Sequence, residues 1–330
     1  MYNNSLLKVS VIGAGRLGLA LAYSISKKND HAVSIASISS RSDKSINAAK
    51  ELLSKRDSNI LFTKNNLLAA SISNCIFICT PDDEIENACK SIFDDGENLS
   101  KITNKQSQDF FFEKSNNTPH VFNPKDIAVI HFSGSKKTDV LKSAKKEGAS
   151  IACMHPLKSF ASVLESSKTL ENTLYGITYD SKDKKIIKII DVLISFLKGR
   201  TVFVENNKKT LYHACACIAS NYLVSLMDFV VELGEEIGLN PDIFLSGISN
   251  LSEGTMANIK KLGTKKALTG PIARGDLNTI KDHVKSLKEL KTSRFTEMYG
   301  IMGKKTAEIA YKNNWINDKS YKDLLYVLKN

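Results

Sequence analysis

Cysteine is scarce in this sequence, and the spacing of the cysteines indicates neither a metal site nor a set of disulfides. The 330-residue chain has six cysteines, and none has the spacing of a zinc site or suggests a disulfide framework. Cys75 and Cys79 share one apolar stretch, while Cys215 and Cys217 lie two apart in an expected helix and therefore face different directions. We expect reduced, mostly buried thiols, as in cytosolic proteins, and no bound metal.

The sequence also lacks features that would indicate a membrane or a nucleic acid. Strand-forming residues begin by Leu6, which leaves no room for a signal peptide, and no apolar run approaches the roughly 20 residues that span a bilayer. The net charge is +11, but the lysines are scattered and no basic stripe is interleaved with aromatic residues. We therefore expect a cytoplasmic protein that binds neither nucleic acid nor membrane. Its positive field would favour an anionic cofactor and an acidic substrate.

The most informative motif that is present is a glycine-rich turn. A short apolar strand runs directly into Gly13-x-Gly15-x-x-Gly18, and an alanine-rich helix follows over residues 17–26. The first glycine permits a tight turn, the second lets the backbone approach a pyrophosphate, and the third lets the helix pack on its strand. In this context the motif predicts a dinucleotide at the N-terminus of the helix.

The end of the next strand indicates which dinucleotide binds. Residues 33–38 are followed by Ser39-Ser40-Arg41 and not by the acidic residue that holds the ribose 2′-hydroxyl in NAD-binding proteins. Two hydroxyls and a guanidinium suit a 2′-phosphate instead. Arginine is scarce, yet two of the six, Arg16 and Arg41, fall beside the expected phosphates. The sequence therefore predicts NADP(H).

Apolar runs alternate with helical stretches through residues 1–205, which predicts an α/β fold with a mostly parallel sheet covered on both faces. Residues 94–125, with Phe110-Phe111-Phe112, break this rhythm and are expected to form a long loop or insertion. The expected strands are residues 8–12, 33–38, 75–79, 127–132, 150–154, 175–179 and 201–204.

After Val204 the pattern becomes helical only. A long apolar helix over 211–233 carries small residues such as Ala214 and Ala219, which would allow close packing against a twin helix in a homodimer. We expect residues 1–205 to form an NADP-binding Rossmann domain and residues 206–330 to form an all-helical C-terminal domain for substrate binding and dimerisation. The further helices expected are residues 241–249, 252–262, 277–290, 294–313 and 318–328.

Polar residues follow several of the expected strands. Ligands of an open parallel sheet bind beyond the carboxyl ends of its strands, where the sequence places Thr80-Pro81, Ser133-Gly134-Ser135 and His155. Each has a structural alternative, as a helix cap, a turn or a buried histidine, but together they favour a site. The residues expected to contact the cofactor are Gly13, Gly15, Arg16, Leu17, Gly18, Ser39, Ser40, Arg41, Thr80, Pro81 and Ser133.

A second polar group lies on the long helix. His213, Cys217 and Asn221 are spaced i, i+4 and i+8 and share one face. Polar side chains on an apolar face are costly unless they are satisfied or used, so the alternative to a site is hydrogen bonding between helices. His213 is the best proton donor for reduction of a carbonyl, because an imidazolium releases a proton near neutral pH. Asn221 would hydrogen-bond the substrate.

The substrate's acid group needs an anchor. Arg274 lies in Gly270-Pro-Ile-Ala-Arg-Gly-Asp276 and could hold a carboxylate with two hydrogen bonds, unless it only pairs with Asp276. Lys158, in His155-Pro-Leu-Lys158, is the alternative anchor for the acid group, and His155 is a further candidate catalytic residue.

Five motifs together resemble a Rossmann-like family, the DUF2520 type, and the resemblance covers nearly the whole chain. It implies a fold like that of the 6-phosphogluconate-dehydrogenase-like reductases and, for some members, reduction of ketopantoate to pantoate for coenzyme A synthesis. The motifs are Gly13-x-Gly15-x-x-Gly18, His131-Phe-Ser-Gly-Ser135, His155-Pro-Leu-Lys-Ser-Phe160, Tyr212-His-Ala-x-Ala-x-x-Ala-Ser-Asn221 and Gly270-Pro-Ile-Ala-Arg-Gly-Asp276.

The better-known ketopantoate reductases carry Lys-x-x-x-Asn-x-x-x-Asn on the corresponding helix, and that pattern falls on His213, Cys217 and Asn221. We therefore expect an NADPH-dependent reductase of a small 2-keto acid, most simply ketopantoate, with histidine in place of lysine as the proton donor. Two alternatives remain open. One is an imine or carbonyl reductase of the pyrroline-5-carboxylate reductase type, and the other is a sensor that binds NADPH without catalysis.

Overall fold

The computed structural model describes residues 7–28, 32–57, 59–94 and 122–329. Within them the chain forms two compact units, Met1–Ser220 and Asn221–Asn330, which we call the sheet unit and the helical unit. The division falls inside one helix, α10 (Lys209–Glu236), whereas the expected domain boundary at residue 205 precedes that helix. Phe110-Phe111-Phe112 and most of the expected insertion at 94–125 lie outside the described residues.

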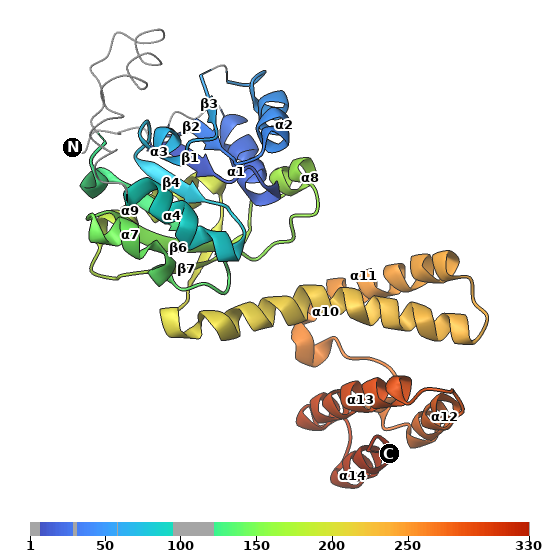
Figure 1. The fold of residues 1–330 in the computed structure, drawn as a ribbon. Coiled ribbons are helices and arrows are strands. Elements are labelled where there is room, and N and C mark those ends of the chain that lie inside the picture. Colours follow the sequence, from blue (N-terminus) through green and yellow to red (C-terminus); the bar gives the residue numbers. More distant parts are fainter. Residues whose placement is uncertain (1–6, 29–31, 58, 95–121, 330) are drawn as a thin grey trace. The chain divides into compact units, whose positions relative to one another are not determined.

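The sheet unit contains an eight-stranded sheet in the order β3-β2-β1-β4-β5-β6-β7-β8 (Figure 1). Every neighbouring pair is parallel except β6 and β7. This arrangement confirms the predicted mostly parallel sheet. The strands are β1 (Leu7–Ile12), β2 (Val33–Ser39), β3 (Leu61–Thr63), β4 (Cys75–Ile78), β5 (Ala128–His131), β6 (Ser150–Pro156), β7 (Leu174–Tyr179) and β8 (Arg200–Phe203).

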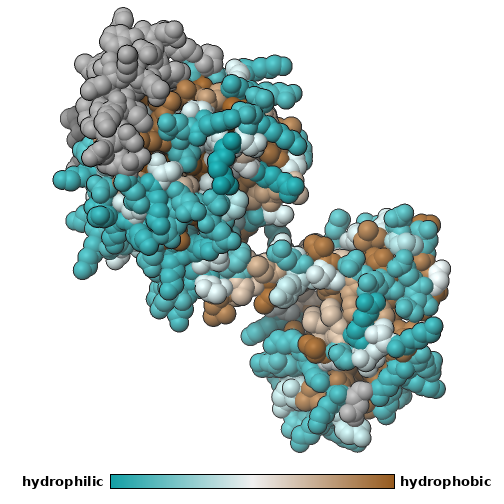
Figure 2. Space-filling view, viewed as in Figure 1, coloured by the Kyte–Doolittle hydropathy of each residue, from teal (hydrophilic) through white to brown (hydrophobic). Residues whose placement is uncertain are grey.

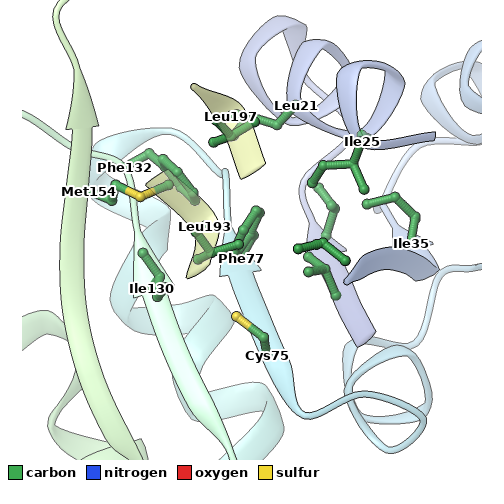
Figure 3. Close-up of a cluster of buried hydrophobic side chains, with 14 of the residues drawn as sticks. Leu21, Ile25, Ile35, Cys75, Phe77, Ile130, Phe132, Met154, Leu193 and Leu197 are labelled. Atoms are coloured by element: carbon green, nitrogen blue, oxygen red, sulfur yellow. The ribbon is translucent and has the colours of Figure 1, made fainter. Parts of the chain in front are cut away.

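Helices cover both faces of this sheet, and the central strands β4 and β5 are buried at every residue, as a position between two layers requires. One core joins the sheet to α1 and α9, where Leu21, Phe77 and Leu193 are fully buried (Figure 3). A second core joins the opposite face to α3, α4 and α7, with Ile78 and Ile92 fully buried. The helices are α1 (Arg16–Ser26), α2 (Asp43–Leu53), α3 (Asn66–Ala70), α4 (Ile85–Phe93), α7 (Lys142–Lys146), α8 (Val163–Lys168) and α9 (Lys184–Leu197).

The helical unit begins within α10 and contains four further helices (Figure 1). Gly234 of α10 packs so closely against the ring of Phe244 that a side chain at residue 234 would collide with it. A small apolar core of Ile280, Ala307 and Leu324 joins the last three helices. These helices are α11 (Pro241–Lys266), α12 (Leu277–Lys288), α13 (Arg294–Lys312) and α14 (Asp318–Val327).

Two details of the predicted elements differ from the structure. The short edge strand β3 was not expected, and residues 241–266 form one helix where two were expected. That helix contains a kink at Gly263, where the backbone leaves helical geometry at φ +76°. The other expected strands and helices are present, with ends displaced by a few residues.

One helix of the described chain, Asn206–Glu236, is long and apolar enough to cross a membrane by length and composition alone. The expectation that no apolar stretch approaches that length is therefore corrected. A single helix of this kind is weak evidence for a membrane span. Its first turn packs into the sheet unit through Lys209. This residue is 1% exposed and donates a hydrogen bond to the Ser133 carbonyl oxygen.

Candidate active site

The glycine turn after β1 lies beside a cavity of about 460 Å³. Gly13 has a φ of +107°, and a Cβ there would lie 2.8 Å from the backbone of Cys79, so only glycine fits. Gly15 is the opposite case, because a Cβ there would meet nothing within 4 Å and would point into open space at the cavity. Because Gly15 has no side chain on the cavity side, a pyrophosphate can approach its backbone closely.

Helix α1 begins at this turn and presents an uncapped end. Its N-cap residue, Gly15, makes no side-chain hydrogen bond to the first turn, which leaves the N–H groups of that turn without a side-chain cap. Arg16 is exposed in the first turn, and Leu17 packs against the core of the sheet unit. Gly18 packs against Val11 and Cys79, where a Cβ would be crowded at 3.0 and 3.1 Å. None of these three residues, which were expected to contact the cofactor, lines the cavity itself.

The residues after β2 line the far part of the same cavity. Ser40 and Arg41 contribute to its wall, as predicted for a 2′-phosphate site. The Arg41 guanidinium is 80% exposed and forms an ion pair with Glu84 at 3.1 Å. Ser39 does not line the cavity, because it is fully buried and its hydroxyl donates a hydrogen bond to Asn66 at 2.7 Å.

Thr80 and Pro81, at the end of β4, close the cavity beside the glycine turn. The Thr80 hydroxyl oxygen is buried without a hydrogen-bond partner among the described residues. A buried orphan hydroxyl is unfavourable unless a ligand satisfies it. The bare backbone of Gly15, the uncapped helix end and this hydroxyl together fit a bound dinucleotide.

The turn after β5 is fixed by a carboxylate that the sequence did not single out. Asp82 accepts hydrogen bonds from the hydroxyls of Ser133 and Ser135, at 2.7 and 2.8 Å. Ser133 therefore positions its own turn rather than lining the cofactor cavity. Asp82 adjoins Thr80-Pro81, so this bond ties the end of β4 to the turn after β5. The sequence showed that Ser133 is a polar residue at the end of a strand. It could not show that Asp82, 51 residues earlier, is its hydrogen-bond partner.

Three aromatic side chains meet over this turn. His155, on β6, approaches the hydroxyl of Tyr212 through Nδ1 at 3.1 Å, and its ring lies edge-on to that of His213 at 5.8 Å. Gly134 makes the approach possible, since a Cβ there would lie 2.5 Å from His213 Nδ1 and 2.9 Å from the His155 ring. That Nδ1 atom is buried without a partner in the described chain. The structure thus brings together His155 and His213, which the sequence predicted, and adds Tyr212.

Burial and nearby positive charge keep His155 neutral. Burial lowers the pKa of His155 to about 4, and repulsion from His213 and Lys209 adds to the effect. Burial likewise lowers the pKa of His131, at the end of β5, to about 3, with Lys209 and His155 contributing. A neutral His155 can share a proton with the Tyr212 hydroxyl in either direction.

Lys209, another residue that the sequence did not single out, lies directly beneath this turn. Its Nζ donates hydrogen bonds to the Ser133 carbonyl oxygen at 3.1 Å and to Cys153 Sγ at 2.9 Å. The contacts cross 76 and 56 residues of sequence, so no local pattern could reveal them.

Three further residues were expected to take part in catalysis. Lys158 hydrogen-bonds the Thr169 hydroxyl. Asn221 is exposed at the start of the helical unit. Arg274 is exposed in the helical unit, and Asp276 accepts from Thr279 to cap α12. The structure does not show an Arg274–Asp276 brace, and the roles of these residues in substrate binding stay predictions.

The fold and the cavity are those of a dinucleotide-binding protein of the Rossmann type, the fold of NADP-dependent oxidoreductases. Two family models match the sequence. Residues 8–102 match the NADP oxidoreductase, coenzyme F420-dependent family, and residues 175–306 match the DUF2520 domain of unknown function. The resemblance to DUF2520 is confirmed over residues 175–306, and the match over residues 8–102 agrees with the expectation of NADP(H).

Solved structures support the same fold. A protein from Thermotoga maritima is 21% identical with a TM-score of 0.63, over 93% of this chain and 99% of its own. A Bacteroides fragilis protein described as an NADP oxidoreductase is 18% identical with a TM-score of 0.61, over 93% and 100%. A Plasmodium falciparum pyrroline carboxylate reductase, solved with NADP bound, is 14% identical with a TM-score of 0.55, over 96% and 98%. The comparison with curated proteins found no match.

Proposed function

We propose that this protein reduces a small 2-keto acid with NADPH, and that the substrate is ketopantoate, which becomes pantoate. The single observation that carries the proposal is the cluster of His155, Tyr212 and His213 on the turn that Asp82 ties to the cofactor cavity. A dinucleotide cavity and a set of proton-transfer groups at the same edge of one sheet are the two parts that carbonyl reduction needs.

The cofactor residues have distinct tasks in this proposal. The backbone of Gly13 and Gly15 and the first turn of α1 hold the pyrophosphate. Arg41 exchanges its ion pair with Glu84 for the 2′-phosphate, with Ser40 beside it. When bound, the nicotinamide supplies a hydride to the carbonyl carbon.

The protein's own groups supply the proton. His213 donates a proton from its ring to the developing alkoxide oxygen. Its Nδ1 is buried against Gly134, and its Nε2 lies 3.6 Å from Cys217 Sγ. The Tyr212 hydroxyl and His155 lie next to it and can return a proton to the ring or orient it. Asn221, Lys158 and Arg274 are the candidates for holding the substrate's polar groups.

The direct test is NADPH oxidation by purified protein given ketopantoate. Replacement His213→Ala should lower kcat by about 10²–10⁴-fold, the usual contribution of a general acid, while the Kd for NADPH stays unchanged. The matched control is His283→Ala, since His283 hydrogen-bonds Tyr299 in the helical unit and has no role in the proposed chemistry. Rescue of a pantothenate auxotroph that lacks ketopantoate reductase tests the same substrate in cells. No turnover with NADPH or NADH would remove the substrate assignment.

Reduction of a cyclic imine is the second candidate, because the fold matches that of a pyrroline carboxylate reductase over 96% of this chain. The same cavity and histidines would serve either carbonyl or imine, so substrate preference has to be measured. A panel of pyrroline-5-carboxylate and 2-keto acids at equal concentration separates the two by kcat/KM.

A further inference from the structure

The amine of Lys209 and the thiol of Cys153 form an unusual pair in the interior of the sheet unit. Their N and S atoms are 2.9 Å apart. Cys153 is 0% exposed and Lys209 is 1% exposed. No carboxylate of the described residues forms an ion pair with Lys209, whose second hydrogen bond goes to the Ser133 carbonyl oxygen. A buried lysine normally has a carboxylate as its counterion, and here sulfur occupies that place.

We propose that Cys153 and Lys209 form a site of covalent modification, in which hydrogen peroxide joins them through a sulfur–nitrogen bond. The inference concerns residues outside the proposed catalytic steps and does not depend on the substrate.

The geometry supplies both reactants and the proton transfers. In the first step the Cys153 thiolate attacks one peroxide oxygen, an S–O bond forms and the O–O bond breaks. The departing hydroxide takes a proton from the Lys209 ammonium, which leaves water and a neutral amine beside the new sulfenic acid. In the second step the amine nitrogen attacks sulfur, the S–N bond forms, and the S–O bond breaks with loss of a second water. One thiol, one amine and one peroxide thus give one sulfenamide and two waters.

Proximity favours this outcome at Cys153, and the charge of Lys209 acts in the same direction against the effect of burial. Burial raises the pKa of the Cys153 thiol, and the Lys209 ammonium acts against that increase by its charge and its hydrogen bond. Burial slows the approach of peroxide, but it also limits further oxidation of the sulfenic acid. An amine already held at 2.9 Å reacts as an intramolecular partner, with a large advantage over any group in solution.

The bond would alter the neighbouring site. It would join β6 to the first turn of α10 and take from the Ser133 carbonyl the hydrogen bond that Lys209 donates. Ser133 directly precedes Gly134, which lies against the rings of His155 and His213, so a shift of this turn would move the two rings.

To test the proposal, the folded 330-residue protein is treated with hydrogen peroxide, and the excess peroxide is removed with catalase. The remaining thiols are then alkylated in denaturant, and the peptides are mapped by mass spectrometry. We expect the peptides that contain Cys153 and Lys209 to appear joined, two hydrogen atoms lighter than their sum, and to separate on addition of dithiothreitol. Cys89 is the matched control in the same chain, being 0% exposed with no lysine amine among its hydrogen-bond partners in the described residues. It should be recovered alkylated.

Two variants sharpen the test. Lys209→Arg keeps the charge but removes the amine, so the joined peptide should disappear and a sulfenic acid at Cys153 should become trappable by dimedone. Cys153→Ser should abolish both products. Recovery of Cys153 as an unmodified thiol or as a sulfinic acid without a bond to Lys209, in protein whose exposed Cys215 is oxidised, would overturn the proposal. Because the readout is mass, failure here is distinguishable from failure of the proposed enzymatic activity.

Discussion

His131 and His155 occupy the ends of neighbouring strands, and their surroundings favour the neutral imidazole. Burial is the main cause, and it lowers the pKa of His131 to about 3 and that of His155 to about 4. In the unfolded chain both would titrate near the ordinary value of about 6.5. Between these pH values the unfolded state therefore binds more protons than the folded state.

This difference predicts acid sensitivity in a defined window. The stabilising contribution is present above pH 6.5 and is lost as the pH falls toward 4, on the order of 3 kcal/mol for His155 alone. Urea unfolding followed by circular dichroism at several pH values between 7 and 4 measures it. His155→Asn should be less stable than the wild type at pH 7 but lose less stability on acidification. Equal pH slopes for the two proteins would contradict the prediction.

Arg41 is a second single residue with a measurable role. Its guanidinium is exposed and pairs with Glu84, so the ion pair itself contributes little to stability. A charge-assisted hydrogen bond to a 2′-phosphate is worth about 1.5–3 kcal/mol. We therefore expect Arg41→Ala to weaken NADPH binding by roughly 10- to 100-fold, with little change for NADH, in titrations by calorimetry. Arg56→Ala, at a guanidinium that stacks on Tyr23 away from the cavity, is the matched control.

At the scale of elements, the turn that follows β5 controls how the histidines meet. Gly134 lies against both imidazole rings, and a methyl group there would be 2.5 Å from His213 Nδ1. Gly134→Ala must therefore displace a ring, and displacements of about 1 Å near reacting groups can cost about 10²-fold in rate. We expect kcat to fall by roughly that factor while the Kd for NADPH is kept. Gly247→Ala, on α11 with nothing within 4 Å of the new methyl group, should leave kcat unchanged.

Most strands and helices could be predicted from the sequence, and two could not. The buried strands were predictable because each is a continuous apolar run bounded by turns, and the parallel order then placed His155 at the edge where the glycine turn lies. β3 was missed because three half-buried residues carry no periodic signal. α11 was divided because its polar composition interrupts the apolar pattern, although the backbone stays helical from Pro241 to the kink at Gly263.

The residues that hydrogen-bond to the site residues were harder to predict from the sequence. Asp82 and Lys209 look like ordinary surface charges in the sequence, and only the fold brings them to Ser133 from 51 and 76 residues away. The stripe of His213 and Asn221 was visible from helical spacing, but spacing alone does not say which of its members meets which strand. His213 was singled out because burying a titratable group on an apolar helix face is costly unless it is hydrogen-bonded or used, and its catalytic role stays a prediction.

At the scale of the whole molecule, α10 and α11 expose an unusual amount of apolar surface. Leu211, Ile218 and Tyr222 lie on one stripe of α10 and are 68%, 59% and 63% exposed, while Ile243 and Leu251 of α11 are 76% and 72% exposed. Figure 2 shows apolar side chains reaching the surface of the helical unit. An exposed apolar stripe along a helix often marks an interface. Small residues on α10 would let a second helix approach closely, which favours a second copy of this chain as the partner.

A homodimer is therefore the expected state in solution. Light scattering on a size-exclusion column at micromolar concentration should give twice the 36.4 kDa mass of one chain. Ile218→Glu places a charge in the centre of the α10 stripe, where desolvation would cost several kcal/mol, so the dimer should dissociate. Ile301→Glu is the matched control, because Ile301 is 67% exposed on α13, outside that stripe. The wild type running as a monomer, or both variants dissociating equally, would show that the α10 stripe is not the contact between copies.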